Sequence, residues 1–242
     1  MDKFQIREDP AAHLAGLKAW LKETEDQPLE EMSDFFTVRL DDYERHMKTW
    51  RDAYRALPDF FPFAMRDLLD LGCGTGLELE SLFPVFPDLR VTAVDLCVPM
   101  LERLEDRFTS VCTLRGDYFA MDYPPEAFDG VLSFQSLHHF SPDKKAGLYA
   151  RLYRTLRPGG VFVLADYLAC CPEEEELMAR ALKRRRAAQN IPPERLVHFD
   201  IPLTPEREIA LLEGAGFSVS FAGSFAGTSI LTARRPRDGE DG

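Results

Sequence analysis

The pattern of apolar and polar residues divides the chain into a helical beginning and an alternating middle. Over residues 1–62 the apolar positions recur at helical spacing, first at Leu14, Leu17 and Leu21. Asp9 and Pro10 before them are typical of an N-cap and a first-turn proline. A second amphipathic stretch follows over residues 33–54. The pattern therefore predicts helices before any strand.

From residue 65 onward, short apolar runs alternate with helical segments. Runs typical of buried strands cover residues 67–71, 90–94, 111–114, 128–134 and 161–165. Helices are expected near residues 77–83, 98–108 and 142–157. This alternation predicts βαβ crossovers and a mainly parallel sheet. The remaining expected elements are a charged helix at 173–186, a helix near 205–214, and strands at 217–221 and 228–233.

The segment that joins the first strand to the next helix is the most informative. It reads Leu68-Leu-Asp-Leu-Gly-Cys-Gly-Thr-Gly76, a buried strand followed by three glycines at alternate positions. Glycine lets the backbone take positive φ and approach a ligand, while the next helix turns its N–H groups towards it. The dinucleotide pattern G-x-G-x-x-G would need glycine where this chain has Leu77. The tighter loop after Asp70 favours a ligand with an ammonium group over a pyrophosphate.

With this motif the chain resembles the class I S-adenosylmethionine-dependent methyltransferases over about residues 64–168. The resemblance implies a Rossmann-like, doubly wound α/β fold with a seven-stranded sheet whose last strand is antiparallel. It implies S-adenosylmethionine (SAM) as cofactor and S-adenosylhomocysteine (SAH) as product. The implied cofactor-binding residues are Asp70, Gly72, Cys73, Gly74, Thr75, Gly76, Asp95, Leu96, Met100, Gly116, Asp117, Tyr118, Gln135 and Ser136.

The resemblance gives these positions separate tasks. Asp70 helps to hold the methionine amino group, and the glycine loop packs against the cofactor. Asp95 follows Gly76 by 19 positions and meets the ribose hydroxyls, since one carboxylate can accept from two hydroxyls. Met100 and residues 116–118 surround the adenine, and residues 134–136 lie under the methionine part. The segment 156–160 matches a family turn.

The residues after the fourth strand bear on the methyl acceptor. Methyl transfer from a sulfonium requires above all a well-placed nucleophile, and a base only where the nucleophile is protonated. The chain lacks the motifs of nucleic-acid base methylation and the acids of metal-dependent catechol-type enzymes, so no metal ion is expected. It has Ser136-Leu-His-His-Phe140, which resembles the small-molecule, quinone-biosynthesis-like branch of the family.

Four polar residues are candidates for catalysis, namely His138, His139, His198 and Asp200. Histidine can act as a base near neutral pH, although pocket lining and packing under the loop are alternatives. His198 and Asp200 interrupt an apolar run, which favours a pocket position or a surface turn. Segments 34–47 and 197–204 also resemble an uncharacterised bacterial subgroup. Candidate substrate and lid contacts are Phe36, Tyr43, His46, Met47, Asp166 and Tyr167.

The chain is expected to divide into five parts. These are a helical lid at 1–62, a cofactor-binding core at 63–171, a helical cap at 172–203, core-completing elements at 204–235 and a flexible tail at 236–242. In related folds an N-terminal helix closes over the cofactor and an insertion after the fifth strand caps the acceptor. Closure excludes water, which competes for the methyl group. Residues 1–30 carry no functional signal.

Composition narrows the partners. The 29 Lys and Arg residues against 41 Asp and Glu residues give a net charge of −12, which disfavours nucleic acid. The basic run at 183–186 follows acids on the same helix, which favours a solvated helix over an RNA-binding patch. No run approaches the roughly 20 apolar residues of a membrane span, and the first ten residues lack a signal-peptide core. Five scattered cysteines are typical of free thiols in a reducing cytosol.

These observations predict a cytoplasmic enzyme, monomeric or homodimeric, that methylates a small molecule on O, N, S or C. One alternative is an RNA- or protein-modifying methyltransferase, which an electropositive face beside the cofactor mouth would favour. Another is a non-catalytic regulatory protein that binds SAM or SAH. A pocket without room beside the sulfonium methyl would favour that alternative.

Overall fold

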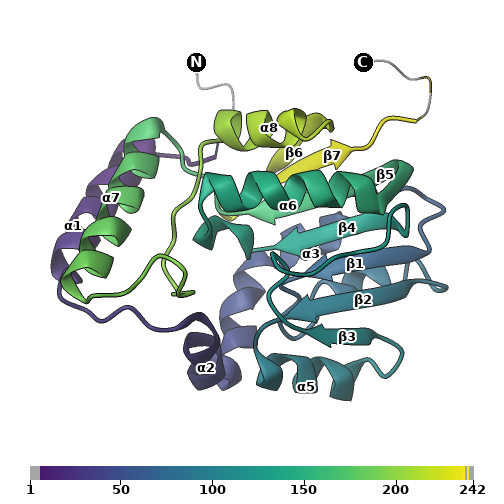
Figure 1. Ribbon diagram of the computed structural model, residues 1–242, viewed down its shortest axis with the longest axis horizontal. Helices are drawn as coiled ribbons and strands as arrows, with labels where there is room; N and C mark the ends of the chain where they lie inside the picture. The colour runs from purple at the N-terminus through teal and green to yellow at the C-terminus, as the bar shows by residue number, and fades with distance from the viewer. Residues whose placement is uncertain (1–5, 238, 240–242) are drawn as a thin grey trace.

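A single seven-stranded sheet runs through the molecule, which a computed structural model describes for residues 6–237 and 239. Its strands are β1 (Asp67–Leu71), β2 (Arg90–Asp95), β3 (Cys112–Arg115), β4 (Phe128–Phe134), β5 (Leu156–Asp166), β6 (Ser218–Phe225) and β7 (Thr228–Arg234). They lie in the order β3-β2-β1-β4-β5-β7-β6 (Figure 1). Strands β1 to β5 are parallel, and β7 is antiparallel to both β5 and β6. The predicted sheet with an antiparallel last strand is confirmed.

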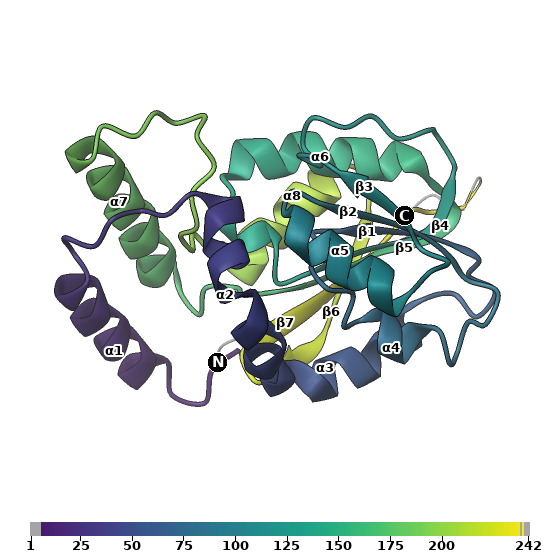
Figure 2. The same ribbon diagram turned by 90° about the horizontal axis from the view of Figure 1, so that it is seen from below.

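Helices cover both faces of this sheet (Figure 2). Helices α6 (Pro142–Thr155) and α8 (Pro205–Gly214) lie on one face, and α3 (Arg51–Ala56), α4 (Leu79–Leu82) and α5 (Val98–Arg107) lie on the other. Successive side chains of a strand point to opposite faces, so Leu69 joins the core under α6 and Leu68 joins the core under α3 to α5. Among the described residues, no helix has the length and apolar character to cross a membrane.

Three elements differ from the expected boundaries. The stretch at 33–54 is divided into α2 (Met32–Met47), a 3₁₀ turn η1 (Lys48–Trp50) and α3, because α2 packs against α5 whereas α3 packs on the sheet. The helix expected at 77–83 is only the short α4. Strand β5 already begins at Leu156, so the expected turn at 156–160 is part of the strand. Gly159, at φ +85°, accommodates the irregular register there.

Two helices pack on each other away from the sheet. Helices α1 (Pro10–Glu23) and α7 (Pro172–Ala188) lie side by side in both views (Figures 1 and 2) and share a small apolar core. They run in the same direction, since His13 contacts Glu174 and Arg185 donates to Thr24. The interpretation of 173–186 as a solvated helix is therefore wrong for one side of α7. Arg185 is buried, because it is covered by α1, a helix that is far from it in the sequence.

A short backbone pairing connects the N-terminal part to the segment after α7. The N–H of Met32 donates to the carbonyl of Leu196 at 3.1 Å, and the N–H of His198 donates to the carbonyl of Glu30 at 3.0 Å. The N–H of Ile201 then donates to the carbonyl of His138 at 2.8 Å, which attaches the same segment to the turn η3 (Leu137–His139) after β4. The predicted lid and cap are thus joined over the sheet edge. Of the expected tail at 236–242, residues 238 and 240–242 lie outside the described residues.

Candidate active site

A cavity of about 710 Å³ lies where β1, β2 and β4 end. Open α/β sheets bind ligands at this edge, and the volume is within the range of small-molecule pockets, about 300–1,000 Å³. The glycine loop, α2 and the segment after α7 supply its walls. The predicted residues that line it are Phe36, Tyr43, His46, Met47, Gly72, Gly74, Asp95, Leu96, Met100, Gly116, Asp117, Tyr118, Gln135, Ser136, His138, His139, Tyr167, His198 and Asp200.

The glycine loop forms one end of the cavity and has no room for side chains. Gly72 and Gly74 have positive φ values of +70° and +50°. A Cβ atom on Gly72 would lie 2.1 Å from Oγ of Ser136, and one on Gly74 would lie 2.8 Å from the hydroxyl of Tyr43. The loop therefore presents bare backbone to the cavity, as a closely bound cofactor requires.

Asp95 lies beside this loop. Its Oδ2 accepts from the N–H of Gly74 at 2.9 Å, and its Oδ1 accepts from the N–H of Cys97 at 2.8 Å. Burial raises the pKa of Asp95, and these backbone donors partly offset the rise. Each carboxylate oxygen has a second lone pair, so Asp95 can also accept from ligand hydroxyls.

Four of the predicted cofactor residues are absent from the cavity wall: Asp70, Cys73, Thr75 and Gly76. Asp70 is almost fully buried, and neither carboxylate oxygen has an aligned hydrogen-bond partner among the described residues. Burial, and next the carboxyl group of Glu78, raise the pKa of Asp70. In this arrangement Asp70 lies behind the cavity wall, and its role toward the cofactor stays a prediction.

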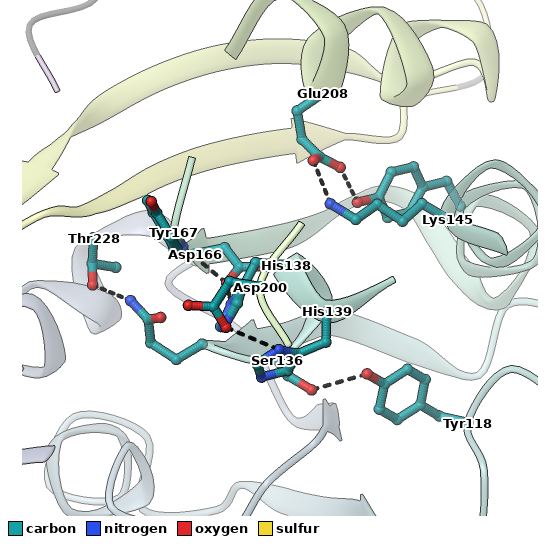
Figure 3. A network of polar contacts seen from close by, with 12 residues as sticks. Tyr118, Ser136, His138, His139, Lys145, Asp166, Tyr167, Asp200, Glu208 and Thr228 are labelled. Carbon is teal, nitrogen blue, oxygen red and sulfur yellow. Dashed lines mark hydrogen bonds and ion pairs between the residues drawn. The ribbon is translucent and has the colours of Figure 1, made fainter. Parts of the chain in front are cut away.

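Histidines and aspartates gather at the other end of the cavity (Figure 3). Nδ1 of His138 lies 2.5 Å from Oδ1 of Asp166, and its Nε2 lies 3.5 Å from Oδ1 of Asp200. Nδ1 of His139 lies 3.2 Å from the same oxygen of Asp200. His198 stacks on Phe35 with 3.4 Å between ring centres. Asp166 is not on the cavity wall; it holds His138 from behind.

The three rings differ in charge. Burial lowers the pKa of His138, but Asp166 and Asp200 outweigh burial and raise it to about 10. Burial and the neighbouring His138 lower the pKa of His139. Burial and the neighbouring His139 lower the pKa of His198 to about 3. One imidazolium thus lies between two carboxylates at neutral pH, beside two neutral rings.

The wall also contains residues that the sequence analysis did not select. They are Arg7, Met32, Ser33, Phe35, Arg39, Asp42, Trp50, Cys97, Phe140, Leu196, Ala226 and Gly227. Arg7 belongs to the part of the chain without a functional signal, yet it donates to the carbonyl of Gly227 at 3.0 Å and lies over the ring of Tyr167. Phe35 directly precedes the predicted contact Phe36 on α2, and its place in the helical pattern did not predict a position on the cavity wall.

Comparison with known families agrees with this geometry. Residues 68–160, which run from β1 into β5, match a family model described as a methyltransferase domain. This part of the chain is therefore similar to a methyltransferase domain. The matched range holds the glycine loop, Asp95, residues 116–118 and the two histidines of η3, whereas the cavity-lining residues before 51 and from 167 onward lie outside it.

Named relatives match only part of the chain. The biotin biosynthesis bifunctional protein BioHC of Teredinibacter turnerae is 35% identical over 109 residues, which are 40% of this chain and 19% of that protein. The malonyl-[acyl-carrier protein] O-methyltransferase of Dechloromonas aromatica is 38% identical over 110 residues, 46% of this chain and 38% of that protein. The chain therefore spans well under two thirds of these relatives.

One solved structure resembles nearly the whole chain. The 1,6-didemethyltoxoflavin-N1-methyltransferase of Burkholderia thailandensis, with bound 1,6-didemethyltoxoflavin and S-adenosylhomocysteine, superposes with a TM-score of 0.60 at 22% identity. The match covers 95% of this chain and 92% of that chain. At this level of identity the resemblance shows a shared fold.

Proposed function

We propose that this protein transfers the methyl group of SAM to a small molecule that binds in the same cavity. The observation that carries the proposal is the continuity of one cavity of about 710 Å³ from the glycine loop to the histidines. A cavity of this size encloses small ligands. The Burkholderia enzyme was solved with a small acceptor and SAH together, which supports room for both in this fold.

The loop end has the features that SAM requires. Gly72 and Gly74 line the cavity with backbone atoms, and Asp95 has lone pairs for ribose hydroxyls. Met100 and Tyr118 also line the cavity and would contact the adenine, whereas Gln135 and Ser136 would contact the methionine part. When bound, SAM supplies a methyl group activated by a sulfonium. These residues bind and orient it, and no proton transfer is required of them.

The histidine end is placed to hold the acceptor. The neutral ring of His198 can accept a hydrogen bond from an acceptor O–H or N–H, which orients the nucleophile. A bound SAM would supply its methyl group to this nucleophile with SAH as the leaving group, and the proton of the nucleophile would pass to the imidazole that holds it. Positioning of the two reactants is the main contribution of the protein.

Helix α2 supports a closed cavity. The hydroxyl of Tyr43 approaches the glycine loop, and Phe35 and Phe36 lie against the ring of His198. These aromatic side chains would shield part of the cavity from the surrounding water. Exclusion of water protects the methyl group from hydrolysis.

Calorimetry with SAH tests the cofactor half of the proposal. We expect binding to the wild-type protein and binding roughly ten- to hundredfold weaker to Asp95→Asn, since hydrogen bonds to a charged group contribute about 1.5–3 kcal/mol. The matched control is Asp143→Asn, an exposed aspartate in the first turn of α6. Absence of SAH binding by the wild type would overturn the proposal.

A panel of acceptors tests the other half. Formation of SAH is measured with small phenols, carboxylic acids and amines, and in parallel with bulk RNA and with protein. Turnover of small molecules is the expected result. Turnover with RNA or protein alone would assign the enzyme to macromolecular acceptors instead.

A further inference from the structure

The groups at the histidine end converge on one point. The donor atoms of His138, His139 and Asp200 all lie within 4.8 Å of one another (Figure 3). The two imidazoles come from η3, whereas Asp200 comes from the segment after α7. The hydrogen bond between Ile201 and the carbonyl of His138 fixes the two segments together.

The distances between these atoms suit a shared metal ion. Nitrogen and oxygen ligands lie about 2.0–2.2 Å from Zn²⁺, so two ligands of a tetrahedral site are about 3.4 Å apart. Oδ1 of Asp200 lies 3.5 Å from Nε2 of His138 and 3.2 Å from Nδ1 of His139. Both distances are close to the spacing between two ligands of a tetrahedral zinc site.

His139 has no better partner in the described part of the chain. Its side chain is only 4% exposed, yet Nδ1 makes no aligned hydrogen bond, although Asp200 is near. Buried ring nitrogens normally have a hydrogen-bond partner. Nδ1 of His139 is thus close to a carboxylate oxygen without a hydrogen bond to it. Two ligands of the same cation are arranged in this way.

Asp166 completes the pattern from behind. Its Oδ1 accepts a hydrogen bond from Nδ1 of His138 at 2.5 Å, and this contact turns Nε2 of His138 towards Asp200 and the cavity. Metal-binding histidines usually donate their second ring nitrogen to a carboxylate in this way. Asp166 and Asp200 together also bring two negative charges to a largely enclosed place.

We propose that His138, His139 and Asp200 bind one divalent transition-metal ion such as Zn²⁺, which takes the place of the proton on Nε2 of His138, with an open coordination position that faces the cavity and takes an oxygen atom of the methyl acceptor. Two imidazoles and one carboxylate suit such ions better than Mg²⁺ or Ca²⁺, which prefer oxygen ligands. The proposal departs from the sequence-based expectation of no metal ion. Its last clause, on the acceptor, rests on the proposed function; the ion site itself does not.

A second group of similar composition serves as the control. His13, Cys170 and Glu174 also lie within ligand distance of one another. There the carboxylate already accepts from His13, Tyr167 and the backbone N–H of Cys170, which is a complete hydrogen-bond set between α1 and α7. We therefore expect no ion at this second group.

The test uses tag-free full-length protein that has been treated with a chelator and dialysed. Calorimetric titration with ZnCl₂, and with MgCl₂ as reference, is combined with elemental analysis of the loaded protein. We expect one zinc ion per chain and at least tenfold weaker binding by His139→Ala and Asp200→Asn, with wild-type stoichiometry in His13→Asn. Circular dichroism and cooperative thermal unfolding establish that the variants are folded. The visible spectrum of the Co²⁺-loaded protein should show tetrahedral coordination in the wild type and not in Asp200→Asn.

Several results would overturn the inference. They are less than one ion per chain in the wild type, equal binding by Asp200→Asn and wild type, and loss of the ion in His13→Asn. In each case the cluster binds no metal ion, and His138 is an imidazolium held by Asp166 and Asp200. Titration of the wild type with SAH separates the two proposals, because zinc binding without SAH binding would refute the function and keep the ion site. SAH binding without zinc binding would refute the ion site and keep the proposed function.

Discussion

Substitution of Gly72 by alanine tests whether the glycine loop is fixed by the contact with Ser136. At φ +70° an alanine costs roughly 1–2 kcal/mol relative to glycine, because its Cβ approaches the following carbonyl. The new Cβ would also lie 2.1 Å from Oγ and 2.7 Å from Cβ of Ser136, and overpacking of this kind costs about 1–3 kcal/mol. We expect Gly72→Ala to lower the free energy of unfolding by about 2–5 kcal/mol, the sum of these two costs, measured by urea denaturation.

A double-mutant cycle separates the two costs. In a Ser136→Gly background both clashing atoms are gone, so the same substitution should cost only the backbone contribution of about 1–2 kcal/mol. The matched control is Gly16→Ala, which lies inside α1 with no atom within 4 Å of the new Cβ and should stabilise the protein by about 0.5–1 kcal/mol. A coupling energy below about 0.5 kcal/mol between Gly72→Ala and Ser136→Gly would refute the reasoning, since such sites would then be independent.

Three further predictions concern buried charges and the packing of α1 on α7. Glu208→Ala should lower the free energy of unfolding by about 3–5 kcal/mol, because it leaves the buried ammonium of Lys145 unpaired. Lys145→Met with Glu208→Leu should cost less, about 1–3 kcal/mol, because only the buried hydroxyl of Tyr149 then loses its acceptor; thermal unfolding measures both. Burial alone would raise the pKa of Asp129, but the backbone amides of Arg66 and Asp67 and the Arg157 side chain lower it. Asp129 therefore stabilises the fold above about pH 4, and its contribution is lost as the pH falls through the lowered value. The gap in unfolding free energy between wild type and Asp129→Asn should narrow on acidification, and a gap that stays constant down to pH 2 would contradict this. Glu174→Gln should weaken the packing of α1 on α7, seen as faster limited proteolysis within residues 10–31, and unchanged cleavage would show that the apolar contacts suffice.

The sheet and the loop end of the site were predictable because their signals are local. A buried strand that runs into alternating glycines specifies its own backbone, and Asp95 follows at the end of the next strand. The predictions were wrong where contacts with a segment far away in the sequence determine the local structure or the burial of a residue. The stretch at 33–54 is broken because its two halves pack on different partners, and Arg185 is buried because α1 covers it.

The histidine end was only half predictable. The sequence selected His138, His139, His198 and Asp200, but nothing local shows that Asp200 meets both rings of η3. That contact depends on the backbone pairing of residues 30–32 with 196–198, which joins parts of the chain far apart in the sequence. Arg7 on the cavity wall depends on the same kind of long-range packing, so its position had no sequence signal.

The backbone pairing between residues 30–32 and 196–198 also has a consequence for protein engineering. Half of the residues that line the cavity lie before residue 51 or after residue 195, outside the stretch that matches the methyltransferase family. A chimera that exchanges acceptor preference should therefore transplant both segments together, as one cassette held by its own hydrogen bonds. Transplanting either segment alone would leave unmatched backbone N–H and carbonyl groups facing the recipient.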